Sequence, residues 1–97
     1  MDIIITKSKK KDKKYDARID DKKTISFGAK GYTDYTQSKD PLQKKRYLSR
    51  HKAREDSKNP NTAAFYATNI LWNKPTIKAS VADINKKFSK LNIKINI

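Results

Sequence analysis

Hydrophobic residues occupy alternate positions in two short runs, 15–19 and 25–27, separated by the polar step 20–22. Because successive side chains of a strand point to opposite faces, each run predicts a strand with one buried face. The short polar step between the runs predicts a β-hairpin, although it lacks the Asn-Gly or Asp-Gly pair that tight hairpin turns favour.

Two further segments have the character of strands, one near each end. Residues 3–5 are three consecutive isoleucines, and the ending LNIKINI alternates apolar with polar positions. An exposed strand edge invites pairing, so the last segment could add to the hairpin, pair with residues 3–5, or extend the sheet of a partner. Residues 7–14, KSKKKDKK, predict a flexible basic tail or loop. We therefore expect a basic N-terminal arm (1–14), a small α+β domain (15–91) and a C-terminal strand or tail (92–97).

Three later segments have helical character. Asp40 and Pro41 form a favourable N-cap and first position, which predicts a helix running to about Glu55. Residues 62–73 are apolar on nearly all sides and predict a short buried helix. Apolar residues recur at spacings of three and four from Ile77 to Leu91, which predicts a third helix that Thr76 can cap. Residues 28–38, which contain both glycines, predict a loop.

Together these elements predict a single small α+β domain. In this domain an N-terminal β-hairpin, which the terminal strands could join, is followed by three α-helices. The length of 97 residues suits one domain. The longest apolar run is far shorter than the roughly 20 residues needed to span a bilayer. We expect the core to be formed by Phe65, Ile70, Leu71, Trp72, Ile77, Val81, Ile84 and Phe88.

The net charge of the chain bears on the kind of partner that it attracts. Lysine and arginine number 24 against 10 acidic residues, which gives a formal net charge of +14. A surface this positive attracts polyanions such as nucleic acid or acidic protein surfaces. Lysines number 20 and arginines 4, which favours charge neutralisation over bidentate reading of bases. The chain has no cysteine, which excludes disulfides and thiolate chemistry.

Candidate chemistry is sparse. His51 is the single histidine, and Glu55, four residues later, could orient its ring, but the chain offers no cysteine nucleophile and no Gly-x-Ser-x-Gly turn. One histidine without cysteine does not make a zinc site, and the aspartates match no calcium loop. We therefore expect a non-enzymatic protein with no catalytic residues, no metal, no cofactor and no small-molecule substrate.

Two features suggest nucleic acid only faintly. The step Gly28-Ala29-Lys30-Gly31 has the spacing of the Gly-x-x-Gly clamp of KH domains, but it follows a strand instead of a helix, so a tight turn is the preferred interpretation. Tyr32, Tyr35 and Tyr47 lie among lysines, where bases could stack on them, but we expect them to pack over the core.

The segment 39–56 is the strongest binding candidate. On a helix, Lys44, Tyr47, Leu48 and His51 would share one inward stripe, and cations would cover the remaining circumference. Such a helix can follow a line of phosphates, each neutralised phosphate adding to the salt dependence. The residues expected to bind nucleic acid or an acidic partner are Lys9, Lys10, Lys11, Lys13, Lys14, Lys30, Lys44, Lys45, Arg46, Arg50, Lys52 and Arg54.

The sequence also resembles a known group of proteins. The shared pattern includes Ser26-Phe27-Gly28, Gly31-Tyr32-x-Asp34-Tyr35-Thr36, Lys39-Asp40-Pro41, Arg50-His51 and Leu71-Trp72-Asn73-Lys74-Pro75-Thr76. It resembles a family of small lysine-rich uncharacterised proteins of large eukaryotic double-stranded DNA viruses, over about residues 14–88. The resemblance implies a viral origin and a place in the particle, but it supplies no activity and no binding residues.

Two hypotheses follow from the charge and the resemblance. The first is a minor capsid-associated virion protein that contacts acidic capsid surfaces or the genome, present in the host cytoplasm or nucleus during assembly. The second is a nucleic-acid-binding protein that acts free in the infected cell. We expect the first to have termini ordered by a partner, and the second to leave the lysine tract and the last residues mobile.

Overall fold

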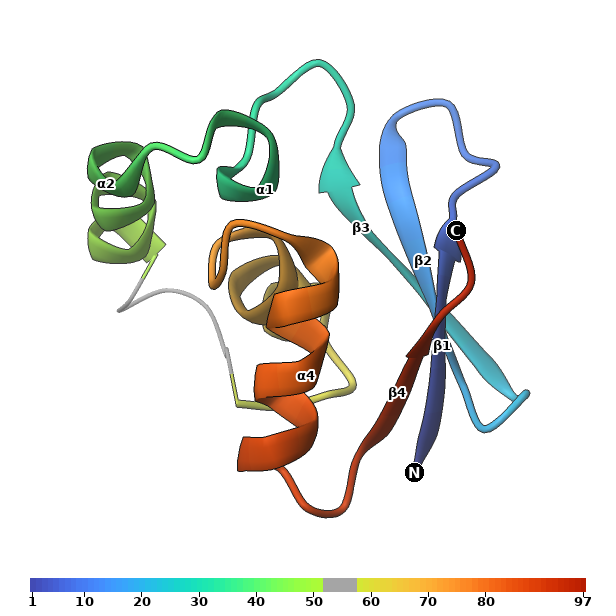
Figure 1. Ribbon diagram of the computed structural model, residues 1–97. Helices are drawn as coiled ribbons and strands as arrows, with labels where there is room; N and C mark the ends of the chain where they lie inside the picture. Colours follow the sequence, from blue (N-terminus) through green and yellow to red (C-terminus); the bar gives the residue numbers. More distant parts are fainter. Residues whose placement is uncertain (52–57) are drawn as a thin grey trace.

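The computed structural model of the protein describes residues 1–51 and 58–97. A four-stranded sheet, with strands in the order β3-β2-β1-β4, carries the described helices on one of its two faces (Figure 1). The elements are β1 (Asp2–Lys7), β2 (Lys13–Ile19), β3 (Lys23–Ala29), α1 (Tyr35–Ser38), α2 (Pro41–His51), α3 (Ala63–Tyr66), the π-helical segment η1 (Ala67–Leu71), α4 (Ile77–Lys87) and β4 (Asn92–Ile95).

The predicted hairpin is confirmed as β2 and β3, which pair antiparallel with Tyr15 opposite Phe27. Its turn is closed by the Lys22 N–H, which donates to the Ile19 carbonyl at 3.0 Å. Asp20 and Asp21 both have positive φ, at 50° and 55°. This is the left-handed geometry of a type I′ turn, which Asp tolerates better than most residues.

Both ends of the chain, expected as a basic arm and as a strand or tail, form strands of the sheet. Residues of the expected arm form β1, which lies between β2 and β4 in the sheet. Ile3 is paired with Ile19 on one side and with Ile93 on the other, and both Ile3 and Ile5 are 0% exposed. Of the three possibilities for the last segment, pairing with residues 3–5 is the one observed, as the parallel pair β1–β4. Burial of apolar side chains accounts for the difference, because a strand with neighbours on both sides buries more than an arm.

The first two helices differ in part from the prediction. The helix α2 begins at Pro41 as expected, but its expected continuation to Glu55 lies outside the described residues. The expected loop 28–38 contains the short helix α1, so its last part was assigned wrongly. Asp34 and Gln37 form a capping box that starts this helix, the side chain of Asp34 accepting from the backbone and that of Gln37 accepting from the Asp34 N–H.

The helix expected over residues 62–73 is divided. Thr62 caps α3, and from Ala67 the chain widens into the π-helical turn η1, where the Trp72 N–H donates to the Ala67 carbonyl at 3.2 Å. The helix α4 begins after Thr76, whose hydroxyl accepts from the Ala79 N–H as predicted. The protein is thus a small single domain of mixed α and β structure, with four strands and four α-helices among the described residues instead of a hairpin and three helices.

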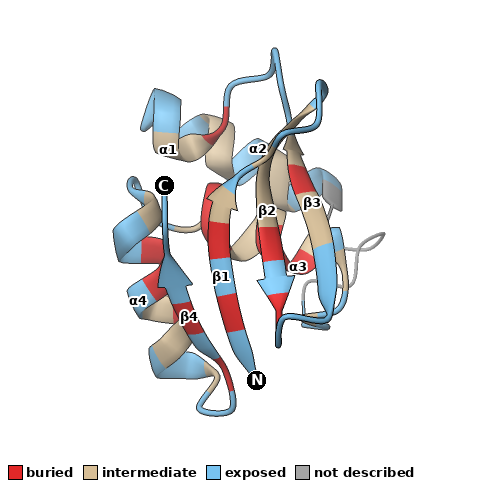
Figure 2. Ribbon diagram, turned by 90° about the vertical axis from the view of Figure 1, so that its right-hand side faces the viewer, coloured by how far each residue is buried: buried red, intermediate tan, exposed pale blue. Residues whose placement is uncertain are grey.

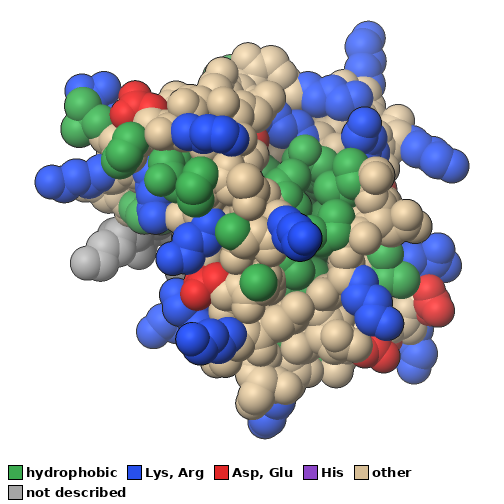
Figure 3. Space-filling model, viewed as in Figure 1, with side chains coloured by type: hydrophobic (Ala, Val, Ile, Leu, Met, Phe, Trp, Pro, Cys, Tyr) green, Lys and Arg blue, Asp and Glu red, His purple; other side chains and the backbone are tan. Residues whose placement is uncertain are grey.

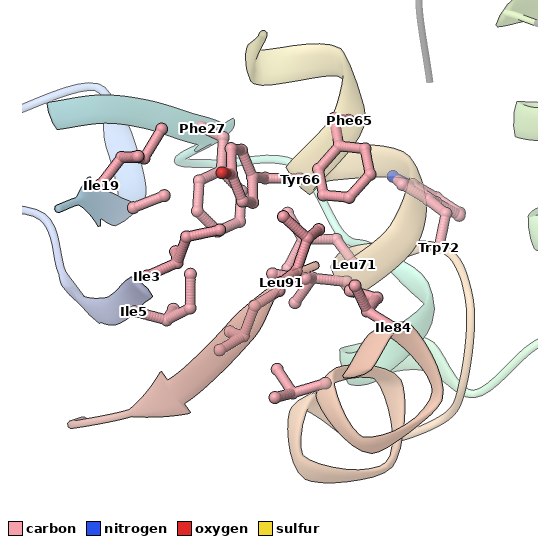
Figure 4. Close-up of a cluster of buried hydrophobic side chains, with 14 residues drawn as sticks. Ile3, Ile5, Ile19, Phe27, Phe65, Tyr66, Leu71, Trp72, Ile84 and Leu91 are labelled. Atoms are coloured by element: carbon pink, nitrogen blue, oxygen red, sulfur yellow. The ribbon is translucent and has the colours of Figure 1, made fainter. Parts of the chain in front are cut away.

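The core lies between the sheet and the helices (Figure 4). Six of the eight predicted core residues are buried, and the other two, Ile77 and Phe88, are half-buried against them. The predicted core list omitted the sheet side, although each hairpin strand was expected to bury one face; this side comes from all four strands and the segment before β4. The buried residues not predicted are Ile3, Ile5, Ala17, Ile19, Phe27, Tyr66, Leu91 and Ile93.

The face of the sheet turned away from the helices is only partly covered. Buried and exposed positions alternate along β1 and β2, as Figure 2 shows for the strands seen from this side. Ile4 and Arg18 are opposite one another on neighbouring strands and are both exposed. One face is therefore packed and the other wetted, as is common in sheets with antiparallel strands.

Candidate functional site

The lysine tract forms a hairpin turn. Ser8 donates its N–H to the Lys14 carbonyl at 3.1 Å, which closes the connection between β1 and β2. The Ser8 hydroxyl also accepts from the Lys10 N–H at 3.1 Å. Lys9, Lys10 and Lys11 are exposed on this turn. Of the tail and the loop expected for this tract, the loop is the one observed, at one end of the sheet.

A second basic loop lies beside this turn. Lys30, directly after β3, donates its N–H to the Asp12 carbonyl at 3.1 Å, and the side chain of Lys30 is exposed. Between the two loops lies a shallow groove of about 400 Å³ whose lining includes Lys7, Lys30 and Tyr32. Sequence reasoning omitted Lys7, although it named the nearby lysines 9–11 as binding residues.

The helix α2 places its residues largely as the predicted stripe requires. Tyr47 and Leu48 are half-buried against the core, and the Tyr47 ring is stacked on Trp72 with centroids 4.2 Å apart and planes 5° apart. Lys45 and Arg46 are exposed on the other side of the helix. The described part of α2 therefore docks through an aromatic pair and turns cations outward; the side chain of His51 lies outside the described residues.

A cleft of about 630 Å³ separates α2 from the loop that follows β3. Gln43, Tyr47 and Arg50 contribute to one wall, the segment 31–34 contributes to the other, and Leu71 and Trp72 add apolar surface. The cleft and the shallow groove share the residues Lys14, Gly31, Tyr32 and Thr33. The lysine tract and α2, which are far apart in sequence, are thus joined across this one loop.

We call this region the basic end of the molecule. Figure 1 shows the β1–β2 turn, the β3–α1 loop and α2 in the upper half of the view, with the β2–β3 turn at the lower right. Lysine and arginine side chains stand around the visible face, and acidic side chains are few (Figure 3). The basic end consists of the exposed cations Lys7, Lys9, Lys10, Lys11, Lys30, Lys45, Arg46 and Arg50, with the half-buried Lys13.

The other end of the sheet has a more balanced charge. Asp2, Asp20 and Asp21 gather there, beside Ile4 and Arg18. Arg18 forms an ion pair with Asp21 at 3.2 Å, and both side chains are largely exposed. The two ends of the sheet therefore differ in charge.

Lys14 has a different place from the one expected. Its ammonium group forms an ion pair with Asp34 at 2.8 Å, and the two side chains are 13% and 4% exposed. It also donates to the Gln37 side chain at 2.8 Å and to the Tyr32 carbonyl. Lys14 thus holds the loop and the start of α1 against β2, and its donors are engaged within the protein.

Lys44 is also directed inward. Its ammonium group donates to the Asn73 carbonyl at 2.6 Å and lies 5.1 Å from the centre of the Tyr35 ring. It therefore fixes α2 to the segment after η1. Two further expected binding residues, Lys52 and Arg54, lie outside the described residues, as does Glu55.

The tyrosines divide into two groups. Tyr35 and Tyr47 pack against the core, as expected for all three. Tyr32 does not: its side chain is 75% exposed at the tip of the loop between the two grooves. Sequence reasoning did not distinguish Tyr32 from the other two tyrosines.

The two glycines of this loop region both have positive φ but differ in the space around them. Gly28 has φ of 77°, and a Cβ at this position would lie 2.9 Å from the Leu71 side chain. Gly31 has φ of 89° and open space around it. The Tyr32 N–H donates to the Ala29 carbonyl at 3.4 Å, which agrees with the expected tight turn after a strand.

Comparison with known proteins gives one positive result. Residues 3–51 match a family described as a family of unknown function, DUF5754. The chain belongs to the DUF5754 family. No curated protein and no solved structure matches it significantly.

The part shared with the DUF5754 family has a clear place in the fold. It runs from β1 through α2 and so contains every cation of the basic end. Leu71 and Trp72, which line the cleft, come from the segment that follows. Across residues 1–51 and 58–97 no cluster of three potential metal ligands and no helix able to cross a membrane is found.

Proposed function

We propose that this DUF5754 protein is a non-enzymatic binding protein whose basic end holds an acidic partner. The observation that carries the proposal is that two adjoining grooves share the loop 31–33, with Lys7 and Lys30 lining one of them and Arg50 of α2 lining the other. Cations spaced over such a surface neutralise a polyanion by many weak, salt-dependent contacts. Binding an anionic partner also reduces the electrostatic repulsion among the cations of a chain with net charge +14.

The setting we propose is a virus particle. The resemblance to small lysine-rich proteins of large DNA viruses supports a minor capsid-associated component, which would contact acidic capsid surfaces or the genome. Lysine, which dominates the cations, suits contacts that must neutralise charge without reading a sequence. In this setting the protein would be made in the host cell and be retained in the virion.

A second function is a nucleic-acid-binding protein acting free in the infected cell. The aromatic lining of the cleft beside Arg50 favours it, since bases stack on aromatic rings. Order at the termini supports neither setting over the other. The two ends hold one another within this chain: the N-terminal amine donates to the Lys90 carbonyl, and the Asn92 N–H to the Met1 carbonyl.

The proposal is tested with two matched charge variants. Lys45→Gln/Arg46→Gln/Arg50→Gln removes three cations from the basic end, and Lys78→Gln/Lys86→Gln/Lys90→Gln removes three exposed cations elsewhere. Binding to duplex DNA and to an acidic polypeptide is measured by fluorescence anisotropy over a salt series. We expect the first variant to weaken binding by about tenfold or more and to flatten the salt dependence, because each lost phosphate contact removes close to one unit of slope. Equal effects of the two variants, or none, would remove the basic end as the binding surface.

The setting is tested separately. Purified particles of the source virus are analysed by quantitative mass spectrometry, with a known capsid protein as the internal standard. We expect the protein in a constant ratio to the capsid protein after washing at moderate salt. Its absence from particles would leave only the free nucleic-acid-binding function.

A further inference from the structure

The two grooves of the basic end form one track. They lie on either side of the loop 31–33 and share it as a wall, and Lys7 and Lys30 line the shallow groove while Arg50 lines the cleft. Of the described residues that line the two grooves, Asp34 is the one carboxylate. Its charge is matched by Lys14 at 2.8 Å, so neither groove repels an anion.

The two grooves differ in chemistry. The shallow groove offers cations, and the larger cleft offers aromatic and apolar surface with polar groups at its walls from Thr33 and Gln43. Its volume of about 630 Å³ exceeds what a carboxylate or a phosphate needs, and it lies in the range of clefts that hold a planar organic ligand. An acidic side chain alone would leave this apolar surface unused.

Tyr32 connects the two grooves. It lines both of them, and its side chain is 75% exposed, so its ring is available to a ligand without rearrangement of the core. The backbone of Tyr32 is fixed, since its carbonyl accepts from the Lys14 ammonium group. A rigid loop that presents an aromatic ring among cations is the arrangement on which unpaired bases stack.

We propose that the basic end binds single-stranded nucleic acid, with the phosphates along Lys7 and Lys30 and an unpaired base in the cleft against Tyr32. A duplex keeps its bases stacked inside and cannot place one in the cleft, so the site prefers a single strand. This inference deepens the proposed function and rests on it, because it assumes that the basic end binds a polyanion.

The test compares a strand that carries bases with an abasic strand of the same charge, beside two further polyanions. The probes are fluorescein-labelled oligothymidylate of 20 nucleotides, an abasic deoxyribose-phosphate strand of the same length, the corresponding duplex, and an acidic polypeptide. We expect oligothymidylate to bind roughly tenfold more tightly than the abasic strand, as one base–aromatic stack supplies. Trp72, the single tryptophan, lines the cleft, so its fluorescence should be quenched by oligothymidylate and unchanged by the abasic strand.

Variants of Tyr32 sharpen the test. Tyr32→Ala should lower the affinity for oligothymidylate to that for the abasic strand and leave the salt dependence unchanged. Tyr32→Phe keeps the ring and should retain the affinity, and Ile97→Ala, also exposed, serves as a control. Because the contact that fixes this loop uses the backbone of residue 32, we expect both Tyr32 variants to fold.

The outcomes separate this inference from the proposed function. Equal binding of oligothymidylate and the abasic strand, with no change in Trp72 fluorescence, would overturn the base-binding cleft and leave polyanion binding intact. Preference for the acidic polypeptide would also overturn it and favour a protein partner. Binding of none of the four ligands would remove both.

Discussion

Lys14 on β2 and Asp34 at the start of α1 form an ion pair of 2.8 Å in which both side chains are largely buried. Asp34 is also the N-cap of α1, so a single carboxylate ends the loop, begins the helix and neutralises a lysine from the sheet. The pair fixes the loop 31–33, and with it the wall shared by the two grooves of the basic end.

We expect Lys14→Met to destabilise the protein by about 3 kcal/mol, because it leaves the Asp34 carboxylate buried without its partner. The double variant Lys14→Met/Asp34→Asn should recover a good part of this loss, since both charges are then absent. Urea denaturation followed by circular dichroism measures both. A loss below about 0.5 kcal/mol for Lys14→Met would place the pair with weak surface ion pairs.

Neighbouring lysines on α2 should behave in opposite ways. Lys44 contacts Asn73 and the Tyr35 ring, whereas Lys45 is exposed. We therefore expect Lys44→Gln to lower the free energy of unfolding by about 1–2 kcal/mol through the lost charged hydrogen bond. Lys45→Gln should leave stability within about 0.5 kcal/mol and weaken polyanion binding instead. Urea denaturation measures the stability of the two variants, and fluorescence anisotropy measures their binding to polyanions. Equal changes in stability and in binding for the two variants would contradict the prediction.

Tyr66 has a polar group in the core. Its side chain is fully buried beside Phe27 and Phe65, and within the described part of the chain its hydroxyl has no hydrogen-bond partner. We expect Tyr66→Phe to stabilise the protein by about 1 kcal/mol at neutral pH, because an unpaired buried hydroxyl is unfavourable. The melting temperature would then rise by several degrees, and a fall would show that the hydroxyl has a partner.

The same residue predicts a response to alkali. Burial raises the pKa of the Tyr66 hydroxyl above its ordinary value of 10.0. The folded state therefore favours the neutral form, and the resulting stability is present below pH ~10 and lost as the pH rises above it. Between pH 8 and 11 the free energy of unfolding should fall more steeply for the wild type than for Tyr66→Phe. The same pH dependence in both proteins would show that Tyr66 is not the group responsible.

Asn85 covers the free edge of the sheet. Its side-chain amide donates to the Ile93 carbonyl at 3.0 Å and accepts from the Ile93 N–H at 2.9 Å. The backbone N–H groups of Asn92 and Asn96 donate in the opposite direction, to the carbonyls of Met1 and Ile5, so Ile93 presents its backbone at the outer edge of β4. A side chain that pairs with an edge in this way blocks the addition of another strand.

We expect Asn85→Leu to lower the free energy of unfolding by about 1–3 kcal/mol, because two backbone groups lose their partners. It should also promote self-association at high salt, where the repulsion between cationic chains is screened. Analytical ultracentrifugation at low and high salt measures this, with the exposed Lys86→Ala on the same helix as control. A monomeric Asn85→Leu variant of unchanged stability would contradict the role of Asn85.

Local patterns determined much of this protein. The alternation of apolar and polar residues predicted the β2–β3 hairpin, Asp40-Pro41 predicted the start of α2, and Thr76 predicted the cap of α4. These predictions succeeded because each feature depends on residues that are close in sequence. The excess of cations and the exposed face of α2 were likewise evident from composition and helical spacing.

Only the tertiary structure decided what depends on pairing at a distance. Residues 3–5 were too short to distinguish a strand from part of an arm, and their place between β2 and β4 follows from the burial of Ile3 and Ile5 on assembly of the sheet. The same assembly turned the lysine tract into a hairpin turn, engaged Lys14 with a carboxylate 20 residues away, and joined this turn to α2 across the loop 31–33. The number of cations is a property of the sequence, whereas their division into structural and exposed groups depends on which side chains the fold brings within hydrogen-bond reach.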